Sequence, residues 1–321
     1  MSGLTFRLFG SLEVTRHGFD GAALCMRPGA QALLAYLLLN RHRHHRREAL
    51  ADLFWGDHDS TSAKRCLSTT LWRLRCELDS THATPTPYVT ITTNGEIGFN
   101  LHSDFWLDVA TFEEKARQGL RQPPSAMNTS EADALEAATH LYLGDLLEGI
   151  DADWALIERE RMRMLYLKSL TQLMEYYQHQ RVYEKSLDCG QKILAMDPLR
   201  EDVHRVMIQL YVDNGQRTLA MRQYDLCRSV LAVELNIPPM PETEALYTQI
   251  SAPTDLCPRP APKVQANHPQ PHTKPPAGET PSFSEKLNPD QTLQQLHIAL
   301  QSLDILRSAL EQLMKQIIER N

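Results

Sequence analysis

The sequence has 321 residues, 42% of them hydrophobic, and a formal net charge of −7 at pH 7. This length allows two or three parts that each bury a core, and the acidic balance argues against a protein that coats nucleic acid over its whole surface. The charge is uneven, because residues 1–105 hold 11 Lys/Arg and 10 Asp/Glu, whereas residues 106–252 hold 15 and 23. The acidic excess therefore lies in the middle of the chain.

Cysteine spacing and the lengths of apolar runs indicate the cellular setting. The six cysteines form no CxxC pair and no regular pattern, which favours free thiols over a disulfide framework or a metal site. The longest apolar run, residues 32–39, is far shorter than a membrane span, and no charged leader precedes an apolar core at the start. We therefore expect a cytoplasmic protein that makes no membrane contact.

Motifs for catalysis and cofactor binding are not found in the sequence. It contains no GxxxxGK[ST] loop, no GxGxxG after a strand, no HExxH and no GxSxG. Carboxylate pairs such as Asp57 with Asp59 and Asp151 with Asp153 flank expected helix starts, where capping explains them. We therefore expect no enzyme activity, no cofactor and no metal.

The first forty residues predict short strands followed by a buried helix. Residues 4–14 alternate apolar and polar side chains on either side of Gly10, which predicts two strands, and residues 22–26 suggest another. Pro28 suits the first turn of a helix that continues to about Asn40 with a wide apolar face. This helix is expected to be a core element.

The densest run of cations, RHRHHRR at residues 41–47, comes next. It has two interpretations, a phosphate-contacting loop at the start of a helix or a solvated connection. The histidines are adjacent rather than at helical ligand spacing, so a metal site is not expected. Residues 48–55 then predict a short helix with Leu50, Leu53 and Phe54 facing inward.

Residues 59–80 predict one long helix with a basic outward face. Leucines at positions 67, 71, 74 and 78 form a narrow apolar stripe, and residues 60–76 hold four cations and no carboxylate. Side chains directed away from or flanking the stripe can bond phosphate and reach base edges. They are Ser62, Lys64, Arg65, Ser68, Thr69, Trp72, Arg73, Arg75 and Cys76. The alternative is an ordinary solvated helix with a basic flank.

A hairpin is predicted immediately after this helix. Residues 88–92 and 97–101 both alternate, and Asn94-Gly95 supplies a tight turn between them. Strands, three helices and a terminal hairpin in this order predict a winged helix-turn-helix. The segments LFGSLEV and REALADLFW, the A-x-x-x-L-x-x-x-L-x-R-L-R pattern from residue 63 and the hairpin resemble the OmpR-type DNA-binding domain of the Streptomyces antibiotic regulatory protein (SARP) family.

The middle of the chain carries the same resemblance. Helices are expected at residues 112–120 and 131–147, and the segments LYLGDLLEG and DWALIERERMRMLY resemble the entry of the bacterial transcriptional activator domain of SARP proteins. A 34-residue period, for example Leu173 with Met207 and Ile193 with Cys227, fits tetratricopeptide-like helix pairs. Stacked helix pairs create surfaces that usually hold protein partners.

The C-terminal part changes character. Residues 253–289 hold ten of the nineteen prolines and predict an extended linker. Residues 290–321 predict an amphipathic helix with heptad apolar positions that suit self-association through a coiled coil. The positions expected to oligomerise are Leu296, Leu300, Leu303, Leu310 and Ile317. The same helix could instead fold back onto the repeats or bind another protein.

These observations predict a mainly α protein with a small β component. Its expected parts are a winged helix (1–105), TPR-like repeats (106–252), a linker (253–289) and an amphipathic helix (290–321). The resemblance implies a transcriptional activator and homo-oligomer that binds direct repeats in promoter DNA and contacts RNA polymerase. An alternative is an interaction scaffold whose winged helix no longer reads DNA. The expected DNA contacts are Arg46, Arg47, Ser62, Lys64, Arg65, Ser68, Thr69, Trp72, Arg73, Arg75, Thr93 and Asn94.

Overall fold

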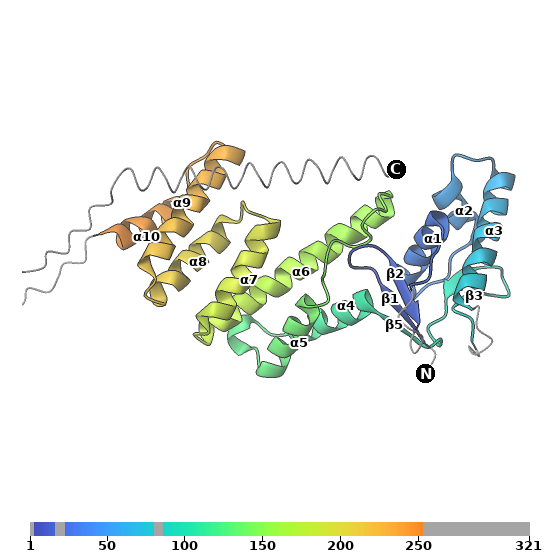
Figure 1. The fold of residues 1–321 in the computed structure, drawn as a ribbon, viewed down its shortest axis with the longest axis horizontal. Helices are drawn as coiled ribbons and strands as arrows, with labels where there is room; N and C mark the ends of the chain where they lie inside the picture. Colours follow the sequence, from blue (N-terminus) through green and yellow to red (C-terminus); the bar gives the residue numbers. More distant parts are fainter. Residues whose placement is uncertain (1–2, 17–22, 80–85, 253–321) are drawn as a thin grey trace, which may run out of the picture. The chain divides into compact units, whose positions relative to one another are not determined.

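The computed structural model describes residues 3–16, 23–79 and 86–252 (Figure 1). The predicted Pro-rich linker and the predicted C-terminal amphipathic helix lie outside the described residues. None of the described helices combines the length and the apolarity needed to cross a membrane.

The N-terminal part begins with a three-stranded sheet in the order β2-β1-β5. Strand β1 (Leu4–Arg7) pairs antiparallel with β2 (Glu13–Arg16) and parallel with β5 (Phe105–Leu107). The sequence did not predict β5, which joins β1 from about 100 residues away. The strand predicted near residues 22–26 is wrong, because the described residues there form only an isolated bridge from Thr15 to Ala23.

Three helices and a hairpin follow in the predicted order. They are α1 (Pro28–Leu39), α2 (Arg47–Trp55), α3 (Ser60–Leu78), β3 (Val89–Ile91) and β4 (Ile97–Phe99). Phe6 of β1 packs edge-on against Tyr88 and Phe99, so the hairpin and the sheet share one core. One predicted orientation is wrong. Leu53 is exposed, because Leu50 and Ala51 make the buried side of the short helix α2.

Helices α4 (Asp108–Gly119) and α5 (Thr129–Thr139), with a short 3-10 turn η1 (Pro124–Ala126) between them, lead into the second half. The helix predicted for residues 131–147 is therefore too long. After His140 the chain turns back, Leu147 adopts a positive φ of 54°, and Leu146 bridges to Phe9 and Gly10. Leu146 and Leu147 are buried next to the chain that follows β1, whereas Leu143 is 77% exposed.

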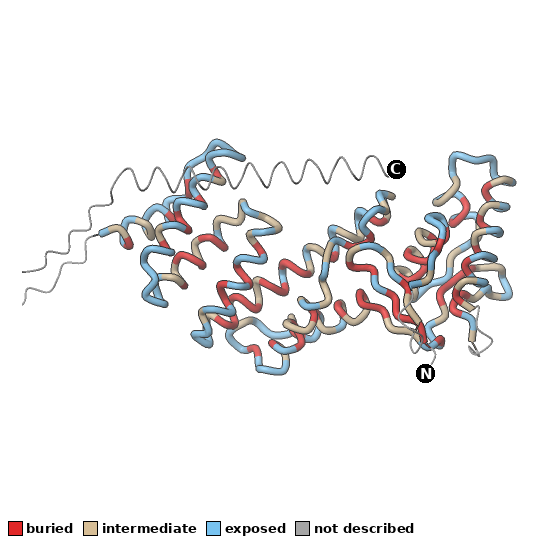
Figure 2. Tube along the Cα trace, viewed as in Figure 1, coloured by how far each residue is buried: buried red, intermediate tan, exposed pale blue. Residues whose placement is uncertain are grey.

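The remaining helices form antiparallel pairs and a closing helix. They are α6 (Asp153–His179), α7 (Tyr183–Met196), α8 (Glu201–Asp213), α9 (Arg217–Glu234) and α10 (Pro241–Ser251). Residues related by the 34-residue period are buried in both pairs, as Ile193 and Cys227 are. Buried side chains form one continuous cluster from β1 through the winged helix into α8 (Figure 2). The mainly helical fold with TPR-like pairs is confirmed.

Candidate nucleic-acid interface

Helix α3 is fixed by its cap and its buried stripe. The Asp59 carboxylate accepts hydrogen bonds from the backbone N–H groups of Thr61 and Ser62, at 3.0 and 3.1 Å, and the bonds from Ser62 lower the pKa of this carboxyl. The side chains that face the core are Ala63, Leu67, Leu71, Leu74 and Leu78, as the leucine spacing predicts. The remaining side chains of α3 are consequently turned toward solvent or toward the hairpin.

The outward side of α3 carries most of the predicted DNA-contacting residues. All are exposed except Ser62, which is half-buried. Trp72 is 67% exposed, so its indole does not pack against the hairpin and is free to contact a ligand. Cys76, which the helical spacing also places on this side, is exposed too.

Of the cationic side chains of α3, one forms an ion pair with a neighbouring helix and three do not form ion pairs within the described residues. Lys64 forms an exposed ion pair with Glu48 of α2 at 3.3 Å. Arg65, Arg73 and Arg75 make no ion pair within the described residues. Three guanidinium groups on one helix are therefore available to an anionic partner without breaking an internal ion pair.

Two hydroxyl groups on α3 have defined orientations. Ser68 Oγ donates to the Lys64 carbonyl at 2.8 Å and accepts from the Arg47 guanidinium at 2.8 Å. Thr69 Oγ1 donates to the Arg65 carbonyl at 3.0 Å. Because its proton is used inside the helix, the Thr69 oxygen is presented as an acceptor, the group that recognises an amino group on a base edge.

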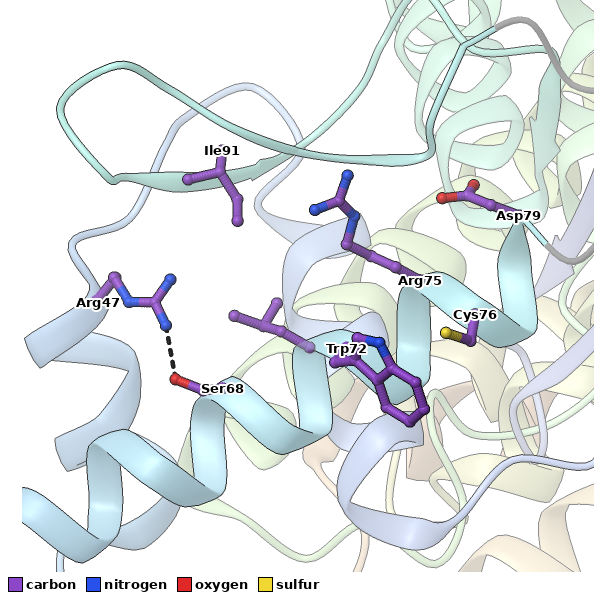
Figure 3. A pocket seen from close by; sticks show the side chains of 8 residues that line it. Arg47, Ser68, Trp72, Arg75, Cys76, Asp79 and Ile91 are labelled. Atoms are coloured by element: carbon purple, nitrogen blue, oxygen red, sulfur yellow. Dashed lines mark hydrogen bonds between the residues drawn. The ribbon is translucent and has the colours of Figure 1, made fainter.

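A groove of about 610 Å³ runs between α3 and the hairpin (Figure 3). It brings together four of the predicted residues, Arg47, Ser68, Trp72 and Arg75, with Cys76, which the helical spacing also places on the outward side. The groove lining further includes Leu71, Asp79 and Ile91, which the sequence did not assign to the site. Ile91 lies on β3 and is exposed at the groove. The groove is thus lined by two arginines and by a mixture of apolar and polar side chains.

The hairpin forms a wing with a defined tip. In the turn between β3 and β4 the N–H of Gly95 donates to the Thr92 carbonyl, and Gly95 has the positive φ of 81° that this turn requires. Thr93 and Asn94 are exposed at the tip and do not line the groove. On its other edge the wing pairs with the basic loop, because His45 and Ile97 exchange two backbone hydrogen bonds of 2.8 Å.

The basic loop is not uniform. Arg46 is exposed, and Arg47 reaches α3. Arg41 is different, because its side chain is largely buried and pairs with Glu113 of α4 at 3.3 Å. The interpretation of residues 41–47 as a phosphate-contacting loop is therefore wrong for Arg41, which is used inside the protein. Within the described residues no cluster of histidine, cysteine and carboxylate side chains could hold a metal ion.

Comparisons with known proteins match the second half to a family model and about three quarters of the chain to bacterial regulatory proteins. Residues 107–251 match the bacterial transcriptional activator domain (BTAD) family model. The chain is 26% identical over 243 residues to the regulatory protein AfsR of Streptomyces coelicolor, covering 75% of this chain but only 24% of AfsR. It is 24% identical over 255 residues to the transcriptional regulatory protein MoaR1 of Mycobacterium tuberculosis, covering 76% of this chain and 78% of MoaR1.

A solved structure of Mycobacterium tuberculosis EmbR in complex with a low-affinity phosphopeptide has the same fold. The TM-score is 0.63 at 20% identity, over 78% of this chain and 65% of that chain. The chain is therefore similar to bacterial transcription regulators of the SARP type, and its residues 107–251 match their activator domain. A winged-helix arrangement of strands and helices precedes the BTAD match in the chain.

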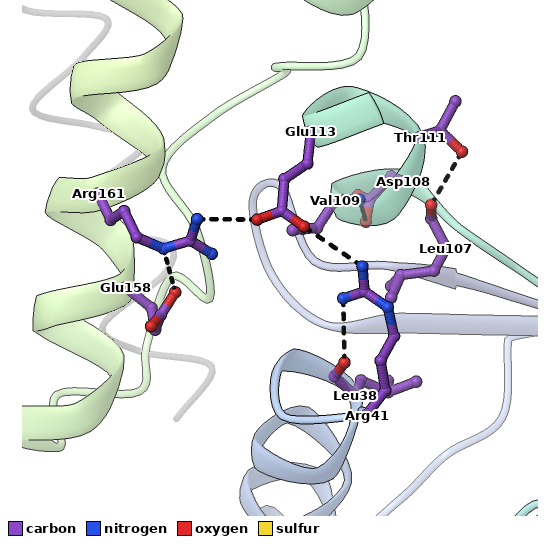
Figure 4. A network of polar contacts seen from close by, with 9 residues as sticks. All are labelled: Leu38, Arg41, Leu107, Asp108, Val109, Thr111, Glu113, Glu158 and Arg161. Carbon is purple, nitrogen blue, oxygen red and sulfur yellow. Dashed lines mark hydrogen bonds and ion pairs between the residues drawn. The ribbon is translucent and has the colours of Figure 1, made fainter. Parts of the chain in front are cut away.

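The BTAD holds the winged helix by a polar network (Figure 4). Glu113 of α4 accepts from Arg41 at 3.3 Å and from Arg161 of α6 at 2.8 Å, and Arg161 also pairs with Glu158 at 2.7 Å. Glu113 is largely buried and lies between two guanidinium groups, Arg41 from the loop after α1 and Arg161 from α6. These ion pairs connect the loop after α1 with α4 and α6 of the BTAD.

Aromatic side chains also pack between the winged helix and the BTAD. Trp154, near the start of α6, lies edge-on to Tyr36 of α1 with ring centroids 5.3 Å apart and contacts Phe54 of α2 at 6.1 Å. Buried Asp108 accepts from the backbone N–H groups of Leu8 and Phe9 at 2.7 and 3.0 Å. Burial raises the pKa of this carboxyl, and these backbone bonds oppose the rise. Through α1 and α2, the BTAD therefore supports the elements that carry the groove.

Proposed function

We propose that this chain is a sequence-specific DNA-binding regulator of transcription. The observation that carries the proposal is the outward face of α3, which presents three arginines without ion pairs within the described residues, the acceptor oxygen of Thr69 and the exposed indole of Trp72. Two of these side chains, Trp72 and Arg75, also line the α3–wing groove. Such a helix suits the major groove, with phosphate contacts on both sides and base contacts between them.

Each side chain has a proposed role. Arg65, Thr69 and Trp72 contact base edges, and Ser62 and Ser68 support them. Lys64, Arg73, Arg75, Arg46 and Arg47 contact phosphates, and Thr93 and Asn94 at the wing tip approach the adjacent minor groove. To bind phosphate, Lys64 must give up its ion pair with Glu48, and Arg47 must give up its hydrogen bond to Ser68. These exchanges replace weak surface contacts with charge-assisted bonds to DNA.

The BTAD is proposed to align protomers on direct repeats in a promoter and to contact RNA polymerase, so that the protein acts as an activator. The names of AfsR and MoaR1 as regulatory proteins and the acidic excess of residues 106–252 support a protein partner for this part. Self-association through Leu296, Leu300, Leu303, Leu310 and Ile317 remains a further proposal, since those residues lie outside the described part.

Selection of bound duplexes from random DNA by the intact chain tests the proposal. The expected result is one recurring motif, bound more tightly than unrelated DNA and lost in Arg73→Ala/Arg75→Ala. Arg121→Ala is the matched control, because Arg121 is also exposed but lies after α4. Failure to enrich any motif, with unrelated DNA bound equally, would support a scaffold whose winged helix does not read DNA.

A further inference from the structure

The BTAD has a groove that the proposed DNA contacts do not use. It has a volume of about 560 Å³ and is lined by side chains of α6, α8 and α10. Among them are Gln178 of α6, Arg205 and Gln209 of α8, and Leu246 and Gln249 of α10. A second hollow of about 260 Å³ shares Gln209, Leu246 and Gln249 with it, so the two hollows adjoin.

Arg205 brings an unpaired guanidinium to this groove. Within the described residues its buried Nε has no hydrogen-bond acceptor, and the half-buried side chain makes no ion pair. One terminal nitrogen lies 4.0 Å from Sδ of Met240, which is a weak acceptor. A buried donor without an acceptor costs free energy. A carboxylate in the groove would accept from this guanidinium and remove the cost.

Three side-chain amides also line the groove, one from each helix. Gln209 donates to the Asp213 carboxylate at 2.7 Å, whereas Gln178 and Gln249 make no hydrogen bond through their amides within the described residues. A side-chain amide offers a donor and an acceptor, the same pair that a peptide bond offers. Amides spread over three helices therefore suit a ligand that presents several peptide groups in series.

The preceding repeat holds a segment of this kind at the corresponding place. By the 34-residue period, Val206 in the groove corresponds to Gln172 of α6. The Gln172 amide donates to the backbone carbonyl of Gln122, which precedes η1, and η1 packs against α6. One repeat earlier, a short irregular segment is therefore bonded through its backbone to a glutamine. On α8 the described residues leave the corresponding place open as the groove.

We propose that this groove binds an extended segment of a protein partner that carries an acidic side chain. The glutamine amides bond the peptide backbone, Arg205 bonds the acidic side chain, and Val206 and Leu246 contact an apolar one. A helical ligand would use its peptide groups internally and leave the amides unpaired. Because Glu242 of α10 also lines the groove, a run of several carboxylates would be repelled. The proposal deepens the protein contact proposed for the BTAD and rests on it for the existence of a partner.

Selection of random peptides, displayed on phage, by the intact chain tests the proposal. Enriched peptides are expected to share an acidic residue next to apolar ones, and a synthetic copy of one should bind the intact chain in solution. Arg205→Met keeps an aliphatic side chain but removes the charge, and it should weaken this binding by about 10-fold or more. Arg222→Met is the matched control, since Arg222 is exposed on α9 and does not line the groove. Circular dichroism of each variant checks that the fold is kept.

A change in the peptide makes the test specific for the bond to Arg205. Replacing its acidic residue by the corresponding amide should lower affinity for the wild type by about 10-fold, but for Arg205→Met by less than about 2-fold. Gln178→Leu combined with Gln249→Leu should weaken binding of both peptides equally, because these amides bond the backbone. Ala245→Trp should abolish binding of both, since Ala245 is exposed on α10 and lines the groove.

Failure to enrich any peptide would overturn the proposal, as would a selected peptide that binds Arg205→Met and Ala245→Trp as tightly as it binds the wild type. Enriched peptides that match residues 253–321 would also overturn it, because the ligand would then be the chain's own C-terminal part. Binding of the wild type to DNA and to RNA polymerase is measured separately. Failure of the proposed function would therefore appear in those two measurements, and failure of the groove proposal in the peptide measurement.

Discussion

Helices α3 and α6 each carry three arginines but use them in opposite ways. In α6, Arg159 donates to three backbone carbonyls, Arg161 bridges two carboxylates, and Arg163 donates to the Met196 carbonyl at 2.8 Å. The α3 arginines, Arg65, Arg73 and Arg75, form no ion pair within the described residues.

The contrast teaches that the number of cations on a helix does not predict its role. Guanidinium groups that are bonded inside the fold add to stability and connect parts of the chain, whereas unpaired ones contribute little to folding and attract an anionic partner. Mutations in the two helices should therefore change different measured quantities, the free energy of unfolding for α6 and DNA affinity for α3.

The largest expected effect is on stability, from Arg159→Ala. The Arg159 side chain, only 19% exposed, bonds the carbonyls of Leu146, Leu147 and Ile150 at 2.8 to 3.0 Å. Its removal leaves those carbonyls without their donor, and we expect a loss of about 3 kcal/mol in the free energy of unfolding. Urea denaturation measures it, and Arg65→Ala should change it by less than about 0.5 kcal/mol. An equal loss of stability in Arg159→Ala and Arg65→Ala would contradict the distinction between the α6 and α3 arginines.

Arg73→Ala should have the opposite effect to Arg159→Ala, with lower DNA affinity and unchanged stability. We expect weaker binding to all DNA sequences and a decrease of about one unit in the slope of log affinity against log salt, because one phosphate contact is lost. The free energy of unfolding should stay within about 0.5 kcal/mol of the wild type. Binding titrations at four salt concentrations measure the slope, and a slope equal to that of the wild type would remove Arg73 from the phosphate-contacting set.

Thr69→Ala should separate the base-contacting residues of α3 from its phosphate-contacting residues. Loss of its acceptor oxygen is expected to change the preference between operator sequences by about 1 to 3 kcal/mol at one base position, with no change in the salt slope. Competition between the selected duplex and its single-base variants gives this preference. If Thr69→Ala and Arg73→Ala lowered affinity equally for every duplex, the separate roles proposed for them would be wrong.

The smallest expected effect is on the pH dependence of stability, through His204 in the BTAD. Gln223 lies 2.7 Å from Nδ1 and the Pro198 carbonyl 3.1 Å from Nε2, which suits a neutral ring, and burial lowers the pKa of His204. Because the folded pKa is below the unfolded one, this group's stability contribution is present above pH about 6.5 and is lost as the pH falls toward the folded pKa. The free energy of unfolding of the wild type should therefore fall more between pH 7 and pH 5 than that of His204→Asn. Parallel pH profiles would contradict this assignment.

Local patterns in the sequence predicted the elements that carry the candidate site. The leucine spacing gave the buried face of α3, Asp59 marked its start, and Asn94-Gly95 marked the wing turn, because each depends on neighbours a few residues away. The outward positions follow from the same spacing. DNA contact by those residues remains a prediction.

The errors come from contacts between distant segments. Strand β5 pairs with β1, and Leu146 bridges to Phe9, so neither could be predicted from its own neighbourhood. The segment around Leu146 has helical periodicity, yet Leu146 and Leu147 are buried next to residues 8–10 and Leu143 is exposed. Arg41 looks like its neighbours in a basic run, and only the fold brings it to Glu113. Exposure of Trp72 was likewise undecided until the wing was placed.

The central claim is that the unpaired arginines of α3 form the DNA-contacting surface. The most direct measurement is the salt dependence of binding to the selected duplex by the intact wild type, by Arg65→Ala/Arg73→Ala/Arg75→Ala and by the control Arg117→Ala/Arg121→Ala. We predict that the triple variant loses sequence preference and about two to three units of salt slope, while the control keeps both. A triple variant with the affinity and slope of the wild type would contradict the claim.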